Sequence, residues 1–236
     1  MGEPRLRARF AEPEDMDAVM ALRGRVFRGG GNDEDAFDAG FRHGIVEDAT
    51  TGALLGCFRA RLFETAVTID QGYSAQFFDL SGLSSRRGAL IEFGRFCVDP
   101  KVRDPDVLRS AMAPLVDWAV ASDAGMIFGC ASLPGQDGAP YAAAFAHVLA
   151  SGRGIKKVLP AGSCSVEFMQ GEPDVSALKA FPSLLRAYLS LGARVAPFAV
   201  PDPDLGTLVV FTALEVDTIP DTYRRSLLKT VHAGRA

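Results

Sequence analysis

Apolar residues alternate or recur with regular spacing along the first quarter of the chain. Residues 5–10, "RLRARF", alternate charged and apolar side chains, a pattern typical of a half-buried strand. Pro13 suits the first turn of a helix, and apolar residues then recur at helical spacing as far as Val26. Two further apolar runs, 45–47 and 53–62, flank "DATTG" and predict a hairpin. The order predicted so far is strand, helix and two paired strands.

Longer apolar runs follow in the middle of the chain. Residues 63–88 are aromatic and partly helical in pattern, and residues 89–98 predict a strand. Asp104 and Pro105 predict a helix start, Pro114 predicts a kink or a break, and Gly125 the helix end. The run "MIFGCASL" then predicts another buried strand.

The last third of the chain continues the alternation. Residues 136–150 predict a helix, 158–168 hold a strand, "PSLLRAYLSLGAR" is a proline-started helix ending at Gly192, and 206–216 predict a strand. This order predicts an α/β (α+β) fold. We expect one domain over 1–236, with a core at about 5–170 and a C-terminal helix and strand extension at about 171–236.

Composition supports a folded domain and narrows its partners. The 236 residues are 48 % hydrophobic and 23 % charged, with a net charge of −4. This balance gives a nucleic acid no basic surface, so we expect no nucleic-acid partner. No signal core and no apolar run of about 18 residues is present, which predicts a cytoplasmic protein, at most peripheral on the inner face of the cytoplasmic membrane. The basic tail "YRRSLLKTVHAGRA" is a solvated helix or a contact with anionic lipid.

Cysteine and histidine patterns argue against a metal or disulfide framework. Four cysteines lie 33 to 40 residues apart without a CxxC pair, which predicts buried thiols in a reducing compartment. The three histidines are too scattered to predict a metal site. His43 and Asp48 have the His-x4-Asp spacing of a class of glycerol-phosphate acyltransferases, but the segment runs into the hairpin, which favours a chance match.

Two charges stand inside the apolar strand "IEFGRFCVDP". Glu92 and Arg95 would point to opposite faces of a regular strand. Gly94 lies between them and is a candidate bulge, which would bring both to one face. The alternative is a buried ion pair of Glu92 with Arg59 or Arg61. Because buried pairs often add little net stability, the cluster favours a functional interpretation.

The order of elements resembles the GNAT acyltransferase fold. Eight segments occur in the order expected of the ornithine-lipid N-acyltransferases: "LRGRVF", "DEDAFD", "GCFRARL", "YSAQFFDLSGL", "IEFGRFCVDP", "FGCASLPGQD", "PSLLRAYLSLGAR" and "DPDLGT". The resemblance implies a mixed central sheet, splayed at its fourth strand and flanked by helices. It also implies transfer of a 3-hydroxyacyl chain from acyl carrier protein to the α-amino group of L-ornithine, giving lyso-ornithine lipid. The same charged residues resemble those of acyl-homoserine lactone synthases.

The resemblance also implies a site. Glu92 is the candidate general base, with Arg95 beside it, and the amine attacks directly without a covalent enzyme intermediate. Asp35 and Asp38 would hold the acceptor's ammonium, and Arg59 and Arg95 would either bind its carboxylate or keep Glu92 ionised. The full expected acceptor site is Arg23, Phe27, Asp35, Asp38 and Arg59, and the expected donor site is Cys97, Val98, Arg103 and Ser132.

The expected donor is the acyl-phosphopantetheine of acyl carrier protein, with no bound cofactor and no metal. Residues 100–106 read "PKVRDPD" where GNAT enzymes carry a glycine-rich pyrophosphate loop. Without glycines, the backbone cannot cradle two phosphates, which disfavours coenzyme A. Lys101 or Arg103 could meet a single phosphodiester.

Three alternatives remain open. The acceptor is another amino acid, such as glutamine or lysine, or the protein is an acyl-homoserine lactone synthase that requires S-adenosylmethionine. From another class, it is a non-catalytic lipid-binding protein of the same fold. The helix with Leu184, Leu185, Tyr188 and Leu189 lines an acyl groove or is ordinary core.

Overall fold

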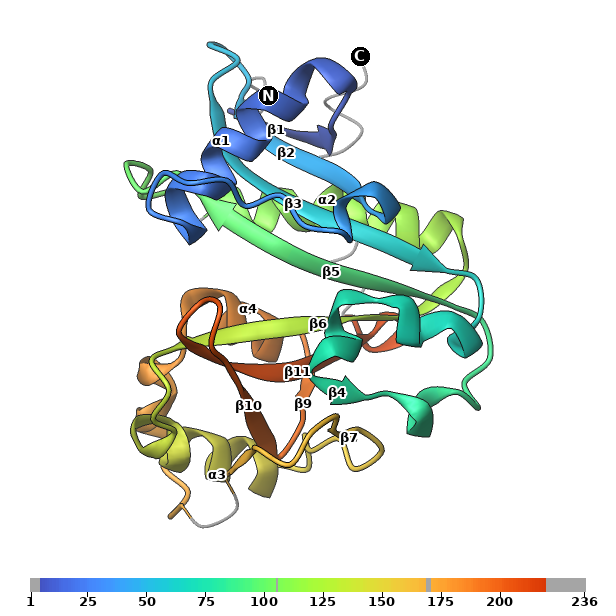
Figure 1. Ribbon diagram of the computed structural model, residues 1–236, viewed down its shortest axis with the longest axis vertical. Helices are drawn as coiled ribbons and strands as arrows, with labels where there is room; N and C mark the ends of the chain where they lie inside the picture. Colours follow the sequence, from blue (N-terminus) through green and yellow to red (C-terminus); the bar gives the residue numbers. More distant parts are fainter. Residues whose placement is uncertain (1–4, 105, 169–170, 220–236) are drawn as a thin grey trace. The chain divides into compact units, whose positions relative to one another are not determined.

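The computed structural model describes residues 5–104, 106–168 and 171–219 (Figure 1). The chain divides into two compact units: unit 1 is 1–62, 93–124 and 220–236, and unit 2 is 63–92 and 125–219. None of the chain positions where the units meet lies near residue 170, the predicted end of the core. The single domain with a C-terminal extension stays a prediction. The predicted basic tail lies outside the described residues.

Unit 1 contains the first elements of the chain. They are β1 (Leu6–Phe10), a 3-10 turn (Pro13–Asp15), α1 (Met16–Phe27), a second 3-10 turn (Asp38–Gly40), β2 (Arg42–Asp48), β3 (Leu54–Phe63), the second part of β5 (Ala89–Val98) and α2 (Asp106–Ala121). The strand order is β1-β2-β3-β5, with β1–β2 and β2–β3 antiparallel. These elements confirm the predicted strand, helix and hairpin.

Helices α1 and α2 cover opposite faces of this sheet. Val19 and Leu22 of α1 pack with Cys57 of β3 in one core cluster. On α2, the Trp118 ring makes an edge contact with Phe10 of β1, at 5.2 Å between centroids. Because side chains alternate along a strand, Arg59 shares the α1 face with Cys57.

Helix α2 is continuous through Pro114, so the predicted break is absent. Nine of its residues are buried, on both sides of the proline. Packing of that face on β1 and β2 stabilises the helix despite the backbone hydrogen bond that proline removes. Gly125 likewise does not end the helix, because it belongs to the next strand.

Unit 2 contains the remaining elements. They are the 3-10 turns Ala66–Gln71, Tyr73–Gln76, Ser81–Leu83, Ala139–Tyr141, Val175–Ala180 and Val216–Thr218, the strands β4 (Phe78–Asp79), β6 (Ala124–Pro134), β7 (Leu159–Pro160), β8 (Val166–Glu167), β9 (Arg194–Val195), β10 (Phe198–Asp202) and β11 (Thr207–Glu215), and the helices α3 (Ala142–Ala150) and α4 (Ser183–Ser190). The first part of β5 also belongs here. The sequence predicted β6, α3, α4 and β11, and it missed β9 and β10. The strand predicted within 158–168 is reduced to β7 and β8.

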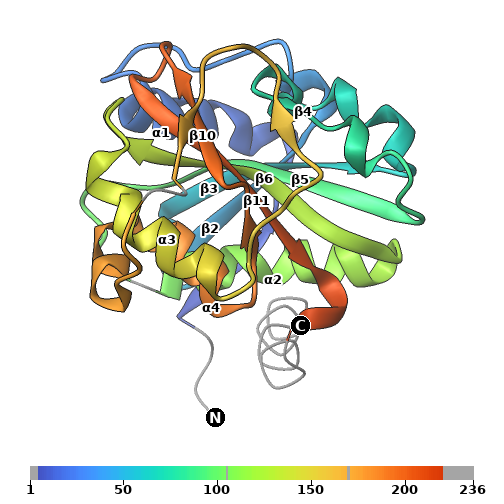
Figure 2. The same cartoon turned by 90° about the horizontal axis from the view of Figure 1, so that it is seen from below.

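The sheet of unit 2 lies between two apolar cores (Figure 2). Its strand order is β6-β11-β10-β8, with β9 also paired to β11. Met126, Phe128 and Cys130 point to one core, together with the 3-10 turns that precede β5. Ala131 and Leu133 point to the other core, under α3 and α4. Alternation along β6 therefore assigns each residue to one face.

None of the helices among the described residues is both long and apolar enough to cross a membrane.

Candidate active site

Strand β5 places Glu92 inside unit 2, where its side chain is 1 % exposed. The Tyr73 N–H donates to Oε2 at 3.0 Å, and the Ser74 N–H donates to Oε1 at 2.6 Å. The Ser74 hydroxyl also donates to Oε1, at 2.5 Å. An ionised carboxylate only accepts hydrogen bonds, so it can satisfy all three donors at once.

Gly72 is required by this arrangement because the Glu92 carboxylate lies against its backbone. A Cβ atom on Gly72 would stand 2.4 Å from Glu92 Oε2, well inside van der Waals contact. The turn Tyr73–Gln76 begins directly after it, so its first N–H groups point at the carboxylate. Residues 72–74, "GYS", thus contact the Glu92 carboxylate closely and donate hydrogen bonds to it.

Cys130 extends the hydrogen-bonded chain from Glu92 toward solvent. Its Sγ donates to Ser74 Oγ at 3.5 Å. Ser74 is fully buried and Cys130 is half-buried. A chain of three side chains therefore connects the half-buried thiol of β6 with the buried carboxylate of β5.

Arg95 lies three residues after Glu92 and has its contacts in unit 1. Its φ is 49°, a left-handed conformation that costs a residue with a Cβ about 1–2 kcal/mol. The predicted strand irregularity is thus at Arg95, one residue after Gly94. Arg95 Nε lies 3.1 Å from Asp33, Nη2 lies 3.4 Å from Asp35, and the guanidinium stands over the Phe27 ring at 5.4 Å.

Arg23 and Arg59 complete a network of buried ion pairs in unit 1. Arg23 donates to Asp33 at 2.9 Å and to Asp38 at 2.6 Å. Arg59 donates through Nη1 to Asp35 and Asp38, both at 2.6 Å. The structure therefore brings together the predicted acceptor residues Arg23, Phe27, Asp35, Asp38 and Arg59, with Arg95. It also pairs each predicted acid with arginine.

Exposure distinguishes the three acids of the network. The side chain of Asp33 is 0 % exposed, that of Asp38 is 9 % and that of Asp35 is 22 %. Asp35 is thus the acid that a small cation reaches most easily. Asp33 was missed by the sequence analysis, because its loop reads as exposed and acidic. Its glycines are indeed exposed, but Asp33 is buried beneath them.

Two pKa shifts follow from this network. Burial opposes the charged form of Asp38, but hydrogen bonds from Arg23, from the Asp35 N–H and from Arg59 lower its pKa to about 2. Burial lowers the pKa of His43, whose Nε2 lies 3.5 Å from Asp38 Oδ1. His43 therefore approaches Asp38, whereas Asp48 accepts the N–H groups of the hairpin turn. The His-x4-Asp spacing is a chance match, as the hairpin context indicated.

The predicted donor residues have four different environments. Cys97 is buried with its Sγ 3.4 Å from Cys57 Sγ, and the hydrogen bond to Cys57 together with burial raises its pKa far above the ordinary value. Val98 is half-buried, and Arg103 is exposed and donates to the Pro100 carbonyl at 2.5 Å. Ser132 is exposed on β6, on the same face as Cys130. Their donor role stays a prediction.

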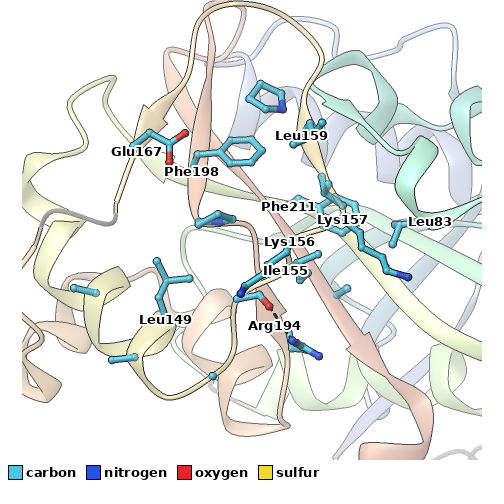
Figure 3. A pocket seen from close by; sticks show the side chains of 18 of the residues that line it. Leu83, Leu149, Ile155, Lys156, Lys157, Leu159, Glu167, Arg194, Phe198 and Phe211 are labelled. Atoms are coloured by element: carbon cyan, nitrogen blue, oxygen red, sulfur yellow. Dashed lines mark hydrogen bonds between the residues drawn. The ribbon is translucent and has the colours of Figure 1, made fainter.

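Unit 2 also contains a cavity of about 1160 Å³ (Figure 3). Leu149, Phe198 and Phe211 reach it from α3, β10 and β11. Further apolar lining comes from Leu83, Met126, Ile155 and Val158, and charged lining from Arg86, Lys156, Lys157, Glu167, Arg194 and Glu215. No sequence pattern predicted this cavity. Leu185 and Leu189 of α4 belong to the opposite core, which confirms the interpretation of that helix as ordinary core.

Comparisons with known proteins agree with this architecture. Residues 19–113 match the family model of the acetyltransferase (GNAT) domain. The chain is 29 % identical to the L-ornithine N(alpha)-acyltransferase of Agrobacterium fabrum over 244 residues, which covers 92 % of this chain and 83 % of that protein. Other curated relatives, 26–29 % identical, carry the same name.

Two solved structures are similar over nearly the whole chain. One is FeeM, an N-acyl amino acid synthase from uncultured soil microbes, with a TM-score of 0.54, 14 % identity and coverage of 97 % of this chain and 98 % of that one. The other is MesI, a CoA-dependent acyl-homoserine lactone synthase, with a TM-score of 0.50, 12 % identity and coverage of 96 % and 95 %. The GNAT fold and the resemblance to ornithine N-acyltransferases are thereby confirmed.

Proposed function

We propose that this acyltransferase moves a 3-hydroxyacyl chain from acyl carrier protein to the α-amino group of L-ornithine, as the first step of ornithine lipid synthesis. The observation that carries the proposal is the buried Glu92 carboxylate, held by two N–H groups and one hydroxyl. The curated relatives supply the acceptor and the reaction.

Glu92 acts as the general base. An α-ammonium must lose a proton before its nitrogen attacks a thioester, and a positioned carboxylate contributes about 10²–10⁴-fold to such a step. The three donors fix the carboxylate in one orientation. Backbone N–H groups beside β5 stabilise the oxyanion that forms at the thioester carbonyl.

The arginine-rich network of unit 1 selects an amino acid. Arg59 and Arg95 pair with the acceptor's carboxylate, because guanidinium groups bind carboxylates in a fixed geometry. Asp35 pairs with an ammonium group, since it is the most exposed of the three acids. Arg23 stays bound to Asp33 and Asp38, and it positions the loop that carries Asp35.

The cavity of unit 2 receives the acyl chain. Binding cavities for small molecules commonly measure about 300–1,000 Å³, so about 1160 Å³ has room for a long aliphatic chain. Each buried methylene contributes about 0.8 kcal/mol. Lys101 or Arg103 meets the single phosphodiester of the carrier's pantetheine arm. We also propose that the protein contacts the inner face of the cytoplasmic membrane and releases its product there.

A mass-spectrometric product screen tests this function. The purified protein is incubated with 3-hydroxyacyl-acyl carrier protein and, separately, ornithine, lysine, glutamine or glycine, with and without S-adenosylmethionine. We expect N-acylated ornithine, and we expect Glu92→Gln to abolish it. Formation of acylated lysine or glutamine would show that the acceptor is a different amino acid. Formation of a lactone with S-adenosylmethionine would show that the protein is an acyl-homoserine lactone synthase. No product in any mixture would overturn the proposal and favour a non-catalytic lipid-binding protein.

A further inference from the structure

A general base must come within hydrogen-bonding distance of the proton that it removes. Glu92 is 1 % exposed and Ser74 is 0 % exposed, so an acceptor cannot approach either of them from solvent. Cys130 is half-buried, and it is hydrogen-bonded to Ser74. The hydrogen-bonded chain through Ser74 thus connects the buried Glu92 carboxylate with a half-buried thiol.

The two hydrogen bonds between these side chains have the same direction, from Cys130 to Ser74 and from Ser74 to Glu92. The ionised Glu92 carboxylate can only accept, so the Ser74 hydroxyl donates its proton to Oε1. Ser74 Oγ then has lone pairs left to accept from a donor, and the Cys130 S–H is that donor at 3.5 Å. Such a chain polarises each of its members, since every donor is also an acceptor.

The outer end of the chain lies on the face of β6 that carries the cavity. Met126 lines the cavity, and Phe128 and Cys130 follow it at intervals of two residues, so all three share one face. Cys130 packs against the apolar cluster that includes Met126 and Phe211, and Phe211 also lines the cavity. The thiol is therefore on the side of the sheet that we assign to the acyl chain.

We propose that Cys130 and Ser74 form a proton relay through which Glu92 deprotonates the acceptor amine. The proposal rests on the proposed function and deepens it, because it names the residue that touches the substrate. The ammonium N–H bond breaks as an S–H bond forms at Cys130. The former thiol proton passes to Ser74 Oγ, and the former hydroxyl proton passes to Glu92 Oε1.

The relay balances over one turnover. Conversion of an ammonium and a thioester into an amide and a thiol releases two protons from nitrogen. One of them protonates the carrier's leaving thiolate, and the other passes to solvent. Glu92 is then ionised again and both hydrogen bonds are restored. Cys130 forms no bond to carbon in this scheme, which distinguishes it from a nucleophile.

Substitutions at the three positions test the relay through kcat and KM. We expect Cys130→Ala, Ser74→Ala and Glu92→Gln each to lower kcat by about 10²-fold with little change in KM. Cys130→Ser restores most of the rate, because a hydroxyl passes a proton as a thiol does. The double variant Cys130→Ala, Glu92→Gln is no slower than either single variant, since both break the same chain. Matched controls are Cys164→Ala and Ser84→Ala, which remove an exposed thiol and an exposed hydroxyl of the same unit.

Two kinetic outcomes would overturn the relay. If Cys130→Ala keeps most of its rate while Glu92→Gln loses it, Glu92 reaches the amine directly. If Cys130→Ser is as slow as Cys130→Ala and an acyl adduct is found on Cys130, the thiol is a nucleophile. In both cases the wild-type protein still forms acylated ornithine, so the proposed function survives.

A second readout does not depend on turnover. The alkylation rate of Cys130 by iodoacetamide, followed by peptide mass spectrometry, reports the state of its thiol. We expect Ser74→Ala and Glu92→Gln to change this rate by about threefold or more, and Ser84→Ala to leave it unchanged. An unchanged alkylation rate in both variants would overturn the proposed relay. This readout applies even if the wild-type protein makes no acylated ornithine.

Discussion

Unit 1 and unit 2 bury carboxylates among different partners. In unit 1, Asp33 and Asp38 are held by Arg23, with Arg59 also bound to Asp38. In unit 2, Glu92 and Asp202 are buried as deeply, but N–H and O–H groups of nearby turns donate to them. The first arrangement pairs acids with arginines, whereas N–H and O–H groups donate hydrogen bonds to the acids in the second.

This difference separates two roles. Hydrogen bonds from Arg23 and Arg59 lower the pKa of Asp38, so this acid is suited to binding and positioning. In unit 2, the Tyr73 N–H, the Ser74 N–H and the Ser74 hydroxyl hold the Glu92 carboxylate in one orientation. Glu92 lies on a chain of proton donors, whereas Asp202 closes the turn between β10 and β11. Glu92 is therefore the buried acid of unit 2 that we propose as the base.

The largest effect is expected from breaking the ion-pair network of unit 1. Arg23→Met removes a fully buried guanidinium and breaks its ion pairs with Asp33 and Asp38, which lowers the free energy of unfolding by about 3–5 kcal/mol. Arg25→Met, on the same helix, breaks a surface pair with Asp99 and costs about 0–1 kcal/mol. Urea unfolding of both variants measures the difference. Equal losses in the free energy of unfolding would show that the buried ion pairs of Arg23 stabilise the protein no more than the surface pair of Arg25 does.

The pH dependence of stability gives the next effect. The pKa of Asp38 is lowered from 3.8 to about 2, so its contribution is present above pH 3.8 and is lost as the pH falls toward 2, by about 2 kcal/mol. The pKa of His43 is lowered from 6.5, so the folded state also loses stability as the pH falls below 6.5. Unfolding free energies across pH for Asp38→Asn and His43→Gln separate the two. A wild-type curve that is flat below pH 6.5 would contradict both shifts.

A smaller effect is expected at the cavity of unit 2. Leu149→Trp fills part of the space that we assign to the acyl chain, and Leu149→Met keeps its volume. We expect the tryptophan variant to lower kcat/KM for long-chain donors by about 10-fold or more relative to short-chain donors. The methionine variant keeps the wild-type ratio. A tryptophan variant with an unchanged chain-length profile would place the acyl chain elsewhere.

The smallest effect is a difference in the rates at which the four thiols react with a reagent, and it involves no change in stability. Cys164 is exposed and should react first with a thiol reagent, and Cys130 more slowly. Cys57 and Cys97 are buried, and the raised pKa of Cys97 keeps it protonated. We expect both to react only after urea is added, as counted by mass spectrometry. Native labelling of Cys97 would contradict its buried position in unit 1.

Local patterns predicted the elements well, because they depend on neighbouring residues. Strand β5 has the predicted bounds, 89–98, and the hairpin of β2 and β3 follows from its turn sequence. α4 ends before Gly192, whose φ of 95° suits the left-handed end of a helix. Strand β10 was missed because Pro201 interrupts a short apolar run.

Contacts between distant residues could not be predicted in the same way. Glu92 was chosen as a charge in an apolar strand, but its partner Ser74 lies 18 residues earlier in a turn with no distinctive pattern. Arg95 and Asp35 are 60 residues apart; the family resemblance implied that both belong to the site, but their ion pair was not predicted. The cavity is lined by segments from Leu83 to Glu215, so no local window contains its signal.

One assay tests the central claim, that the donor-held carboxylate of β5 is the base. Product formation from 3-hydroxyacyl-acyl carrier protein and ornithine is compared for the wild-type protein, Glu92→Gln and Asp202→Asn, each confirmed as folded. We predict that Glu92→Gln lowers kcat by at least about 10²-fold and that Asp202→Asn, the other buried carboxylate of unit 2, stays near the wild-type rate. Equal rates for the two variants would contradict the account.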